Sequence, residues 1–326
     1  MKAAVRTKYG LPGDLSIKEL DIPVPKENEV LIRVRASTVN RSDCHVLSGR
    51  PLFMHLFTGF FKPRESIIGS DFTGQVEAIG STVNAFKPGD KIMGFGDVFG
   101  CGAHAQYFVL PEARAIEAMV IMPNNLSYMQ AAACLEGTFY AASGINQLKP
   151  KAGQKALVYG ASGAIGSAYV QFLKYYGVYV TAVCGGENAL LVRSLGADKV
   201  IDYKTEDFTK DGKRYDFIFD AVGKSSFFKC KPLLTKRGLF TSSGGLENMF
   251  LAMLTPIFGG KKVLFIVPKD IAGELNFIKG LIEKGNFKPV IDRKYPLAKI
   301  AEAYTYVASG QKIGNVIITM DDEISN

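Results

Sequence analysis

The spacing of apolar and polar residues changes once along the chain, near residue 127. Before that point, segments such as Glu29 to Ala36 alternate apolar and polar residues with a period close to two, and Gly74 to Ile79 repeats this more weakly. Such alternation predicts β-strands. Pro-Gly and Gly-Asp pairs between the segments predict turns. The first part of the chain is therefore expected to be β-rich, with a bent or partly closed sheet.

Beyond Ser127, helical and strand-like patterns alternate with short connections. The predicted helices cover residues 129–145, 165–176, 188–195 and 225–234, and the predicted strands cover 155–159, 179–183, 199–201, 217–221, 238–242 and 262–267. This alternation is typical of an α/β fold in which helices cover both faces of a parallel sheet. A last stretch adds a helix at 274–284, a strand at 289–295, a helix at 300–309 and a strand at 315–319.

The strand predicted at 155–159 runs directly into three glycines, Gly160, Gly163 and Gly166, and then into a helix. Residues without a β-carbon let the backbone turn sharply and bring its amides close to a pyrophosphate, while the helix N-terminus favours the negative charge. Because 34 glycines occur in the chain, the spacing alone is weak evidence. The strand-glycine-helix context is what predicts a dinucleotide site here, rather than a tight turn of structural use only.

The end of the next predicted strand bears on which dinucleotide binds. Proteins that bind NAD usually place a carboxylate there for the ribose hydroxyls, whereas this chain has Cys184, Gly185 and Gly186. Glu187 follows, and no Arg or Lys stands next to it in the sequence. The missing acid at the strand end favours NADP(H) over NAD(H), although Glu187 opposes a 2′-phosphate unless it is a solvated carboxylate at a helix start.

Length and composition restrict the remaining possibilities. The 326 residues are 47% apolar, enough for about two domains with real cores. The formal charge of +8 favours anionic partners, but Lys is scattered, so nucleic-acid binding is a weak alternative. No apolar run of 18 residues predicts a membrane span, and the first residues lack the long apolar region of a secretion signal. Five scattered cysteines are typical of a cytoplasmic protein with reduced thiols.

Several stretches together resemble the medium-chain dehydrogenase/reductase superfamily, in its zinc-free quinone oxidoreductase, or zeta-crystallin-like, branch. They are 39–49, 68–80, 86–90, 160–166, 195–203, 216–223 and 314–319, and the resemblance covers essentially the whole chain. It implies an α/β protein with a GroES-like β-rich catalytic domain, residues 1–124 with 270–326, and a Rossmann domain with a doubly wound parallel sheet, residues 125–269. It also makes a homodimer the expectation.

The resemblance implies cofactor contacts at successive strand ends. The glycine turn and the residues Ala161, Ser162, Ala164 and Ile165 would hold the pyrophosphate. Gly185 and Asn188 would lie near the adenosine phosphate, and Tyr203 against the adenine ribose. The remaining implied contacts, toward the nicotinamide side, are Val222, Gly223, Ser243, Gly244, Phe265, Ile266, Val267 and Asn315. Many relatives carry a basic residue where Glu187 stands, which weakens the expectation of strong NADP(H) preference.

The zinc-dependent members of this superfamily hold catalytic zinc with Cys and His, and the matching positions here are Asn40, Ser70 and Glu136. An amide, a hydroxyl and one carboxylate are poor ligands for Zn²⁺. A pairing of Cys44 and His45 with Cys101 and His104 is a weaker rival, since no short metal-binding spacing is present. We therefore expect no metal.

Without zinc, a reduced nicotinamide can still deliver hydride to a carbon whose negative charge is delocalised. The expected function is therefore a zinc-independent NAD(P)H-dependent oxidoreductase acting on a quinone or an α,β-unsaturated carbonyl, with Asn40, Ser70 and Glu136 as candidate catalytic residues. Each of them could instead have a structural role, for example Asn40 as a turn cap. An alternative function is a nucleotide-sensing protein that binds NADP(H) without turnover. Two apolar segments, 51–61 and 246–254, are expected to frame a mouth for a small hydrophobic substrate.

Overall fold

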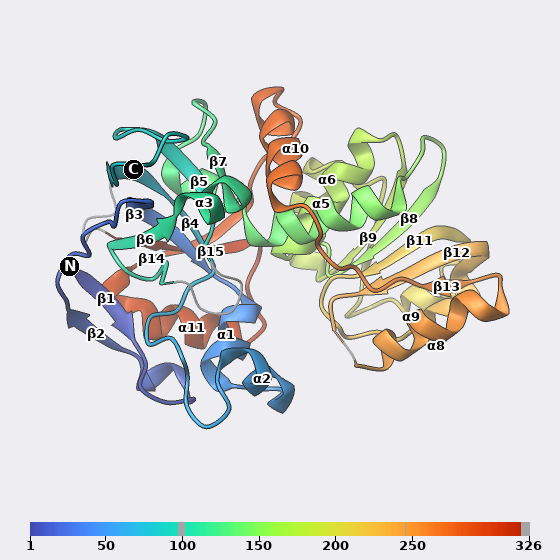
Figure 1. The fold of residues 1–326 in the computed structure, drawn as a ribbon. Coiled ribbons are helices and arrows are strands. Elements are labelled where there is room, and N and C mark those ends of the chain that lie inside the picture. The colour runs from blue at the N-terminus through green and yellow to red at the C-terminus, as the bar shows by residue number, and fades with distance from the viewer. Residues whose placement is uncertain (97–101, 245, 321–326) are drawn as a thin grey trace. The chain divides into compact units, whose positions relative to one another are not determined.

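The computed structural model describes residues 1–96, 102–244 and 246–320 (Figure 1). The chain forms two compact units. The first comprises residues 1–139, 270–283 and those from 289 onwards, and the second comprises residues 140–269 and 284–288. Residues 125–139, which the sequence prediction assigned to the second domain, thus belong to the first unit, and 284–288 belong to the second.

The second unit is built on a parallel sheet whose strand order is β10-β9-β8-β11-β12-β13. Renumbered along the chain, this is the order 3-2-1-4-5-6 of a doubly wound dinucleotide-binding sheet. Figure 1 shows α5 and α6 on one face of this sheet and α8 and α9 on the other. The strands are β8 (Lys155–Tyr159), β9 (Tyr179–Cys184), β10 (Lys199–Asp202), β11 (Tyr215–Asp220), β12 (Leu234–Ser242) and β13 (Lys262–Val263).

Strand β8 occupies the centre of this sheet because it is apolar on both faces. Its residues Ala156, Leu157 and Val158 have no solvent exposure, as expected for a parallel strand covered on both sides. The helices of the unit are α5 (Glu136–Leu148, which begins in the first unit), α6 (Ala164–Tyr175), α7 (Ala189–Ser194), α8 (Phe227–Cys230) and α9 (Leu246–Phe258). The predicted doubly wound fold is confirmed.

The first unit contains a mixed sheet of order β14-β15-β3-β4-β5-β7, with β6 also paired to β3, and a separate β1-β2 hairpin. Its strands are β1 (Lys2–Val5), β2 (Ser16–Glu19), β3 (Glu29–Val39), β4 (Asp71–Ile79), β5 (Lys91–Phe95), β6 (Tyr107–Pro111), β7 (Met119–Ile121), β14 (Ile291–Pro296) and β15 (Asn315–Thr319). Its helices are α1 (Arg41–Ser48), α2 (His55–Thr58), α3 (Glu112–Ala118), α4 (Tyr128–Ala132), α10 (Ile271–Glu283) and α11 (Ile300–Ala308).

The late strand β15 is an internal strand of the first unit's sheet. It pairs in parallel with β14 and antiparallel with β3, where Ile317 lies opposite Thr38. Phe72, Ile92 and Tyr304 are fully buried in the core of this unit. The predicted β-rich first domain is therefore confirmed, and its sheet is completed by the end of the described chain.

Several predicted elements were wrong in extent, and the strand expected at 238–242 begins earlier, at Leu234. The helix expected at 129–145 is two helices, α4 and α5, separated by a turn in which the amides of Cys134 and Leu135 bond three residues back. The helix expected at 225–234 contains α8 and then a 3₁₀ turn over Lys231–Leu233, where Pro232 removes a helix donor. The strand expected at 262–267 covers only Lys262–Val263.

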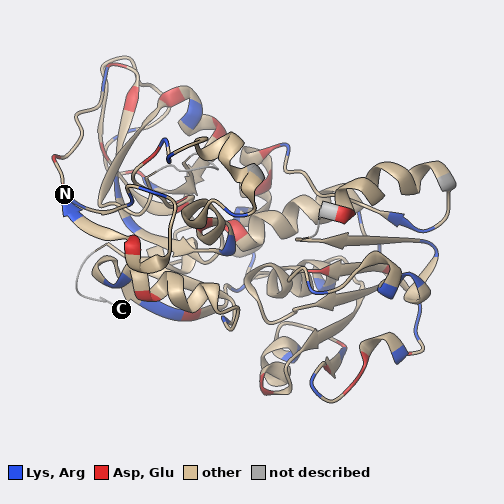
Figure 2. Ribbon diagram, turned by 90° about the horizontal axis from the view of Figure 1, so that it is seen from below, with Lys and Arg blue, Asp and Glu red and all other residues tan. Residues whose placement is uncertain are grey.

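No helix in the described part of the chain is both long and apolar enough to cross a membrane. Figure 2 shows Lys and Arg interspersed with Asp and Glu in both units. The apolar segments predicted to frame a substrate mouth form α2 with a preceding 3₁₀ turn (Leu52–Met54) in the first unit and α9 in the second. Both carry exposed large apolar side chains, including Phe60, Phe61 and Met253.

Candidate active site

The carboxyl ends of the parallel strands bring most of the predicted cofactor residues to one edge of the second unit. The strands end level with one another, since Tyr159 pairs with Val183 and Asp220, and Asp220 pairs with Ser242. The residues that follow these ends are the glycine turn after β8, Gly185 and Asn188 after β9, Tyr203 after β10, Val222 and Gly223 after β11, Ser243 and Gly244 after β12, and Phe265, Ile266 and Val267 after β13. Dinucleotides bind at this edge of such sheets.

The glycine turn leaves no room for side chains at two of its positions. Gly160 has φ +80°, and a β-carbon there would lie 2.5 Å from Cγ1 of Val222. A β-carbon on Gly166 would collide with the carbonyl oxygen of Gly160. The turn is fixed to the neighbouring strand by hydrogen bonds from the amides of Gly160 and Ala161 to the carbonyl of Val183, at 2.9 and 3.1 Å.

Helix α6 begins immediately after this turn, with Gly163 as its N-cap residue. The side chain of Gly163 cannot satisfy the first amides of the helix, because it is a hydrogen atom. The early amides of a helix have no acceptor within the helix, and together with the helix dipole they favour an anion. The turn and α6 therefore fit the predicted pyrophosphate site at Ser162, Gly163, Ala164 and Ile165.

Asp220, a residue not singled out from the sequence, shapes the loop after β11. Its buried carboxylate accepts hydrogen bonds from the amides of Val222 (3.2 Å), Lys224 (3.3 Å) and Ser225 (2.7 Å), and from the hydroxyl of Ser242 (3.2 Å). These bonds hold the chain that carries Val222 and Gly223 against the end of β12. The signal in the sequence was a lone acid at the end of an apolar strand, 217–220.

Glu187 has a cationic partner that its sequence neighbours do not reveal. The ammonium of Lys204, which follows β10, lies 2.9 and 3.0 Å from the carboxylate oxygens of Glu187. Pairing of β9 with β10 brings the ends of these strands together, with Asp202 opposite Cys184. The ammonium beside Glu187 lowers the pKa of that carboxyl, and Glu187 raises the pKa of Lys204.

Asn315 belongs to the first unit, whereas the other predicted cofactor residues belong to the second. It begins β15 in the first unit, is buried, and donates from its side-chain amide to the carbonyls of Ala133 (3.0 Å) and Val290 (3.1 Å). Those two bonds use both hydrogens of the amide group. The structure thus gives Asn315 a local role in the first unit.

The three candidate catalytic residues, Asn40, Ser70 and Glu136, lie in one hydrogen-bonded network of the first unit. Ser70, just before β4, has its hydroxyl 3.1 Å from Oε2 of Glu136 and 3.3 Å from Oδ1 of Asp43. Ser42 donates to Oε1 of Glu136. Ser70 is half-buried, whereas Glu136 is 8% exposed.

Asn40 occupies the other end of this network. Its backbone amide donates to Oδ2 of Asp43 at 2.7 Å, and its side-chain amide donates to the hydroxyl of Thr38 and, at 3.3 Å, to Oδ2 of Asp71. Asp71 also accepts from the Thr38 amide at 2.8 Å and the Thr38 hydroxyl at 2.6 Å. Asn40 is thus committed to positioning carboxylates, and it also caps α1.

Burial raises the pKa of the carboxyl groups of this network. Burial, with the charge of Asp71 adding to it, raises the pKa of Glu136 to about 7. Burial, with the charges of Glu136 and Asp71, raises the pKa of Asp43 well above its ordinary value. The Glu136 carboxylate partly offsets the effect of burial on Lys312, whose pKa is lowered. Because Ser70 has one proton and two carboxyl neighbours, it can pass a proton between Asp43 and Glu136.

The side chains at the superfamily's zinc positions do not fit zinc. Asn40 and Ser70 donate their hydrogens to carboxylates, which leaves one carboxylate, Glu136, as an anionic ligand, whereas zinc sites use thiolate and imidazole. Within residues 1–96, 102–244 and 246–320, no group of three or more His, Cys, Asp and Glu side chains could hold a metal ion.

The second candidate zinc set was Cys44 and His45 with Cys101 and His104. In the structure His104 and Cys44 contact other groups. His104 is fully buried, with Nε2 2.9 Å from the carbonyl of Thr38 and Nδ1 3.2 Å from the hydroxyl of Tyr304. Burial lowers the pKa of His104 to about 4. Cys44 points its thiol toward the carbonyl of Tyr304 at 3.9 Å, and Cys101 lies outside the described residues.

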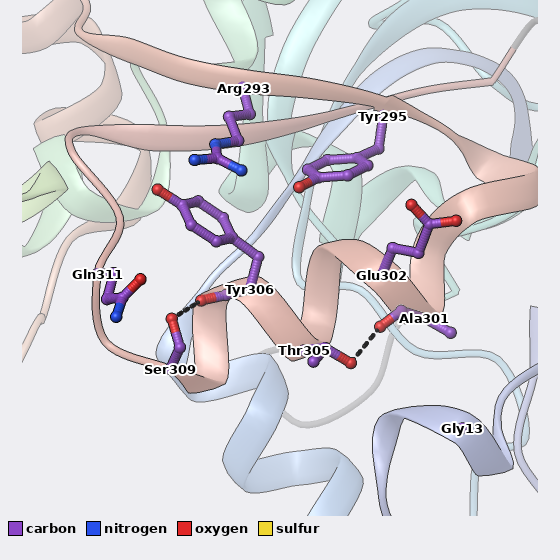
Figure 3. Close-up of a pocket in the computed structure, with 9 residues that line it drawn as sticks. All are labelled: Gly13, Arg293, Tyr295, Ala301, Glu302, Thr305, Tyr306, Ser309 and Gln311. Atoms are coloured by element: carbon purple, nitrogen blue, oxygen red, sulfur yellow. Dashed lines mark hydrogen bonds between the residues drawn. The ribbon is translucent and has the colours of Figure 1, made fainter.

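An open hollow of about 530 Å³ in the first unit shares no residue with the predicted site (Figure 3). Arg293 lies over the ring of Tyr306, with its guanidinium carbon 3.9 Å from the ring centre. The hollow lies between β14 and α11 and is lined by Gly13, Arg293, Tyr295, Ala301, Glu302, Thr305, Tyr306, Ser309 and Gln311.

Comparisons with known proteins agree with this architecture. The family model for an alcohol dehydrogenase GroES-like domain matches residues 26–123, and the model for a zinc-binding dehydrogenase matches residues 195–318. The chloroplastic quinone-oxidoreductase QR1 of Triphysaria versicolor is 32% identical over 98% of both chains. The chloroplastic NADPH-dependent alkenal/one oxidoreductase of Arabidopsis thaliana is 30% identical over 98% of this chain and 79% of its own length.

A solved structure shares the same fold. The quinone oxidoreductase from Coxiella burnetii superposes with a TM-score of 0.88 at 24% identity, over 98% of this chain and 99% of that one. The chain belongs to the medium-chain dehydrogenase/reductase superfamily, in its quinone oxidoreductase branch, which confirms the resemblance seen in the sequence.

Proposed function

We propose that this protein is a zinc-independent, NADP(H)-preferring reductase of quinones or α,β-unsaturated carbonyls. The observation that carries the proposal is the buried Glu136, whose pKa is raised to about 7 and which is bonded through Ser70 to Asp43, in a chain that also has a dinucleotide edge. Named relatives act on quinones and on alkenals or enones, and one of them is NADPH-dependent. We place the protein in the cytoplasm because its five scattered cysteines are typical of reduced intracellular thiols. A homodimer is expected on family grounds.

The residues at the carboxyl edge suit the cofactor. The N-terminus of α6, whose N-cap residue Gly163 has no side chain, offers main-chain donors to a pyrophosphate. Tyr203 is half-exposed after β10, where it can lie against the adenosine, and Val222 and Gly223 are held by Asp220 on the nicotinamide side. A bound reduced nicotinamide supplies a hydride.

The network of the first unit supplies the matching proton. Ser70 donates its hydroxyl proton to the substrate oxygen on which negative charge develops, and Glu136 returns a proton to the Ser70 oxygen. The hydride and this proton together complete a two-electron reduction. Because the pKa of Glu136 is raised to about 7, the group can release a proton near neutral pH.

The same chemistry limits the substrate class. In a quinone or an enone the charge left by hydride addition is spread over a conjugated system, so a hydrogen-bond donor can replace a Lewis acid. The oxygen of an enolate is more basic than that of a hydroquinone anion, and enone reduction should therefore depend more strongly on the proton from Glu136.

Steady-state oxidation of NADPH with a quinone and an enone tests the proposal. We expect turnover on both acceptors by a sample containing far less than one zinc ion per chain. Glu136→Gln should lower kcat for the enone by about 100-fold, the usual scale of general acid catalysis, and for the quinone by less. Its NADPH affinity should be unchanged.

Other outcomes would contradict the proposal. Turnover that requires added zinc would remove the zinc-independent mechanism. Tight NADPH binding with no turnover on any quinone or enone would instead support a nucleotide-sensing protein. An equal effect of Glu136→Gln on both acceptors, accompanied by weaker NADPH binding, would show a structural role for Glu136.

A further inference from the structure

The ion pair between Glu187 and Lys204 lies at the carboxyl edge of the sheet, where the adenosine end of a dinucleotide binds in such folds. We propose that Lys204 binds the 2′-phosphate of NADPH, and that Glu187 competes with this phosphate for Lys204 and so sets the ratio of NADPH to NADH binding. The inference rests on the proposed function, since it requires a dinucleotide along this edge.

The backbone fixes the position of Lys204 at the end of β10. The amide of Tyr203 donates to the carbonyl of Cys184 at 3.2 Å, which joins the ends of β10 and β9. The amide of Lys204 donates to Oδ1 of Asp202 at 2.9 Å, which turns the chain directly after the strand. Lys204 therefore projects from a fixed turn, and its ammonium reaches Glu187 on the neighbouring strand's loop.

The ion pair can open at little cost. The side chains of Lys204 and Glu187 are 52% and 55% exposed, and exposed pairs of this kind contribute little to stability. An ammonium in such a pair exchanges readily between a carboxylate and a phosphate, because both are oxygen anions and phosphate carries the greater charge. Lys204 is therefore available to a ligand that displaces Glu187.

The surrounding charges make Lys204 necessary for a 2′-phosphate. Besides Glu187, the carboxylate of Asp202 faces this edge, and its Oδ2 would lie 2.5 Å from a β-carbon on Gly186. A phosphate placed here without Lys204 would meet two carboxylates and be repelled. With Lys204, the same phosphate has a direct cationic partner, and the small Gly185 and Gly186 leave space for it.

Glu187 has the opposite preference. In NADH the ribose carries a hydroxyl in place of the 2′-phosphate, and a carboxylate after the second strand is the usual acceptor for that hydroxyl. The pair thus joins one residue that favours NADPH to one that favours NADH. We infer a protein that binds both cofactors, with a preference that either residue can shift.

The test measures the dissociation constants of NADPH and NADH by fluorescence titration of the full chain at low salt. Lys204→Met should weaken NADPH binding by about tenfold to a hundredfold, the range for losing a hydrogen bond to a charged group, and leave NADH binding within about twofold. Glu187→Gln should tighten NADPH binding and weaken NADH binding, each by about threefold or more. Added salt should shrink the NADPH effects.

Lys236→Met is the matched control. Lys236 is an exposed lysine near the beginning of β12, at the other end of a parallel strand from the carboxyl edge, so its loss gives the same change in net charge. It should leave the dissociation constants of both cofactors unchanged. NADH binding by Lys204→Met serves as the internal check that the edge is folded.

Each result decides the inference. NADPH binding by Lys204→Met that stays within twofold of the original chain would overturn it, as would an equal loss in Lys236→Met. A decrease in NADPH affinity in Glu187→Gln would overturn the competition between Glu187 and the phosphate. Failure of the original chain to bind either cofactor would instead contradict the proposed function.

Discussion

We expect the difference in free energy of unfolding between Glu136→Gln and the original chain to depend on pH. The difference should be more positive at alkaline pH than at acidic pH. Glu136 is 8% exposed, and burial with the charge of Asp71 raises its pKa from an ordinary value of 4.5 to about 7. A raised pKa means that the folded protein holds the proton more tightly than the unfolded chain does. The stability from this proton is complete below pH 4.5 and is lost as the pH rises toward 7.

The size of this effect follows from the same values. One pKa unit corresponds to about 1.4 kcal/mol, so the rise to about 7 amounts to about 3 kcal/mol, most of which falls between pH 5 and pH 8. Gln keeps the size of a protonated Glu and cannot ionise. The difference in free energy of unfolding, Glu136→Gln minus original, should therefore become more positive by about 2 to 3 kcal/mol from pH 5 to pH 8.

Urea unfolding followed by circular dichroism and tyrosine fluorescence at the two pH values measures this difference. If the two units unfold separately, the transition of the first unit, which contains Glu136, is the one that should move. Glu77→Gln, which removes an exposed carboxylate on β4, is the control and should show no pH-dependent difference. A Glu136→Gln difference that is the same at both pH values, or that falls as the pH rises, would refute the assignment of a buried, proton-holding Glu136.

Three further substitutions test candidate residues in each of the two units. Gly160→Ala should lower cofactor affinity by more than about tenfold and cost about 2 kcal/mol of stability, because φ is +80° and the new β-carbon would meet Val222. Asp220→Ala should cost about 2 to 4 kcal/mol in urea unfolding, since its loss leaves loop amides without an acceptor. Asn315→Ala should cost about 1 to 3 kcal/mol but leave NADPH affinity within about twofold, because its amide bonds only local carbonyls.

Controls separate these effects from general destabilisation. Gly212→Ala places alanine at a similar φ of +72° with no atom within 4 Å of the new β-carbon, so it should show the backbone strain without the loss of cofactor affinity. Equal behaviour of Gly160→Ala and Gly212→Ala would contradict a cofactor role for the glycine turn. A large loss of NADPH affinity in Asn315→Ala would show that Asn315 contacts the cofactor, as the family resemblance implies.

Patterns of neighbouring residues were sufficient to predict the bounds of some strands and helices. The strand at 315–319 and the strand, glycine turn and helix around Gly160 were predicted with bounds within one residue of those observed, because apolar runs bounded by glycine signal a buried strand and the helix that follows it. The helix expected at 129–145 failed for the opposite reason. Its apolar pattern continues through Cys134 without Gly or Pro, and only the bonds of the folded turn reveal the interruption.

Contacts between residues that are far apart in the chain could not be predicted from patterns of neighbouring residues. Lys204 stands 17 residues after Glu187, and only the pairing of β9 with β10 brings the two together. The candidates Asn40, Ser70 and Glu136 were chosen through family positions, and the network that joins them requires the ends of β3, β4 and α5 to meet. Alternation in the sequence predicts that strands exist, whereas strand order determines which side chains face each other.

The position of β15 inside the first unit's sheet affects the order in which the two units fold during synthesis. The ribosome delivers the 140–269 segment, with every strand of its sheet, before it delivers Asn315–Thr319. The first unit emerges earliest, yet β3 and β14 stay without the strand between them until that late segment arrives. The earlier-made half of the polypeptide should thus complete its folding last, and nascent chains arrested before residue 315 should expose the open side of β3 to chaperones.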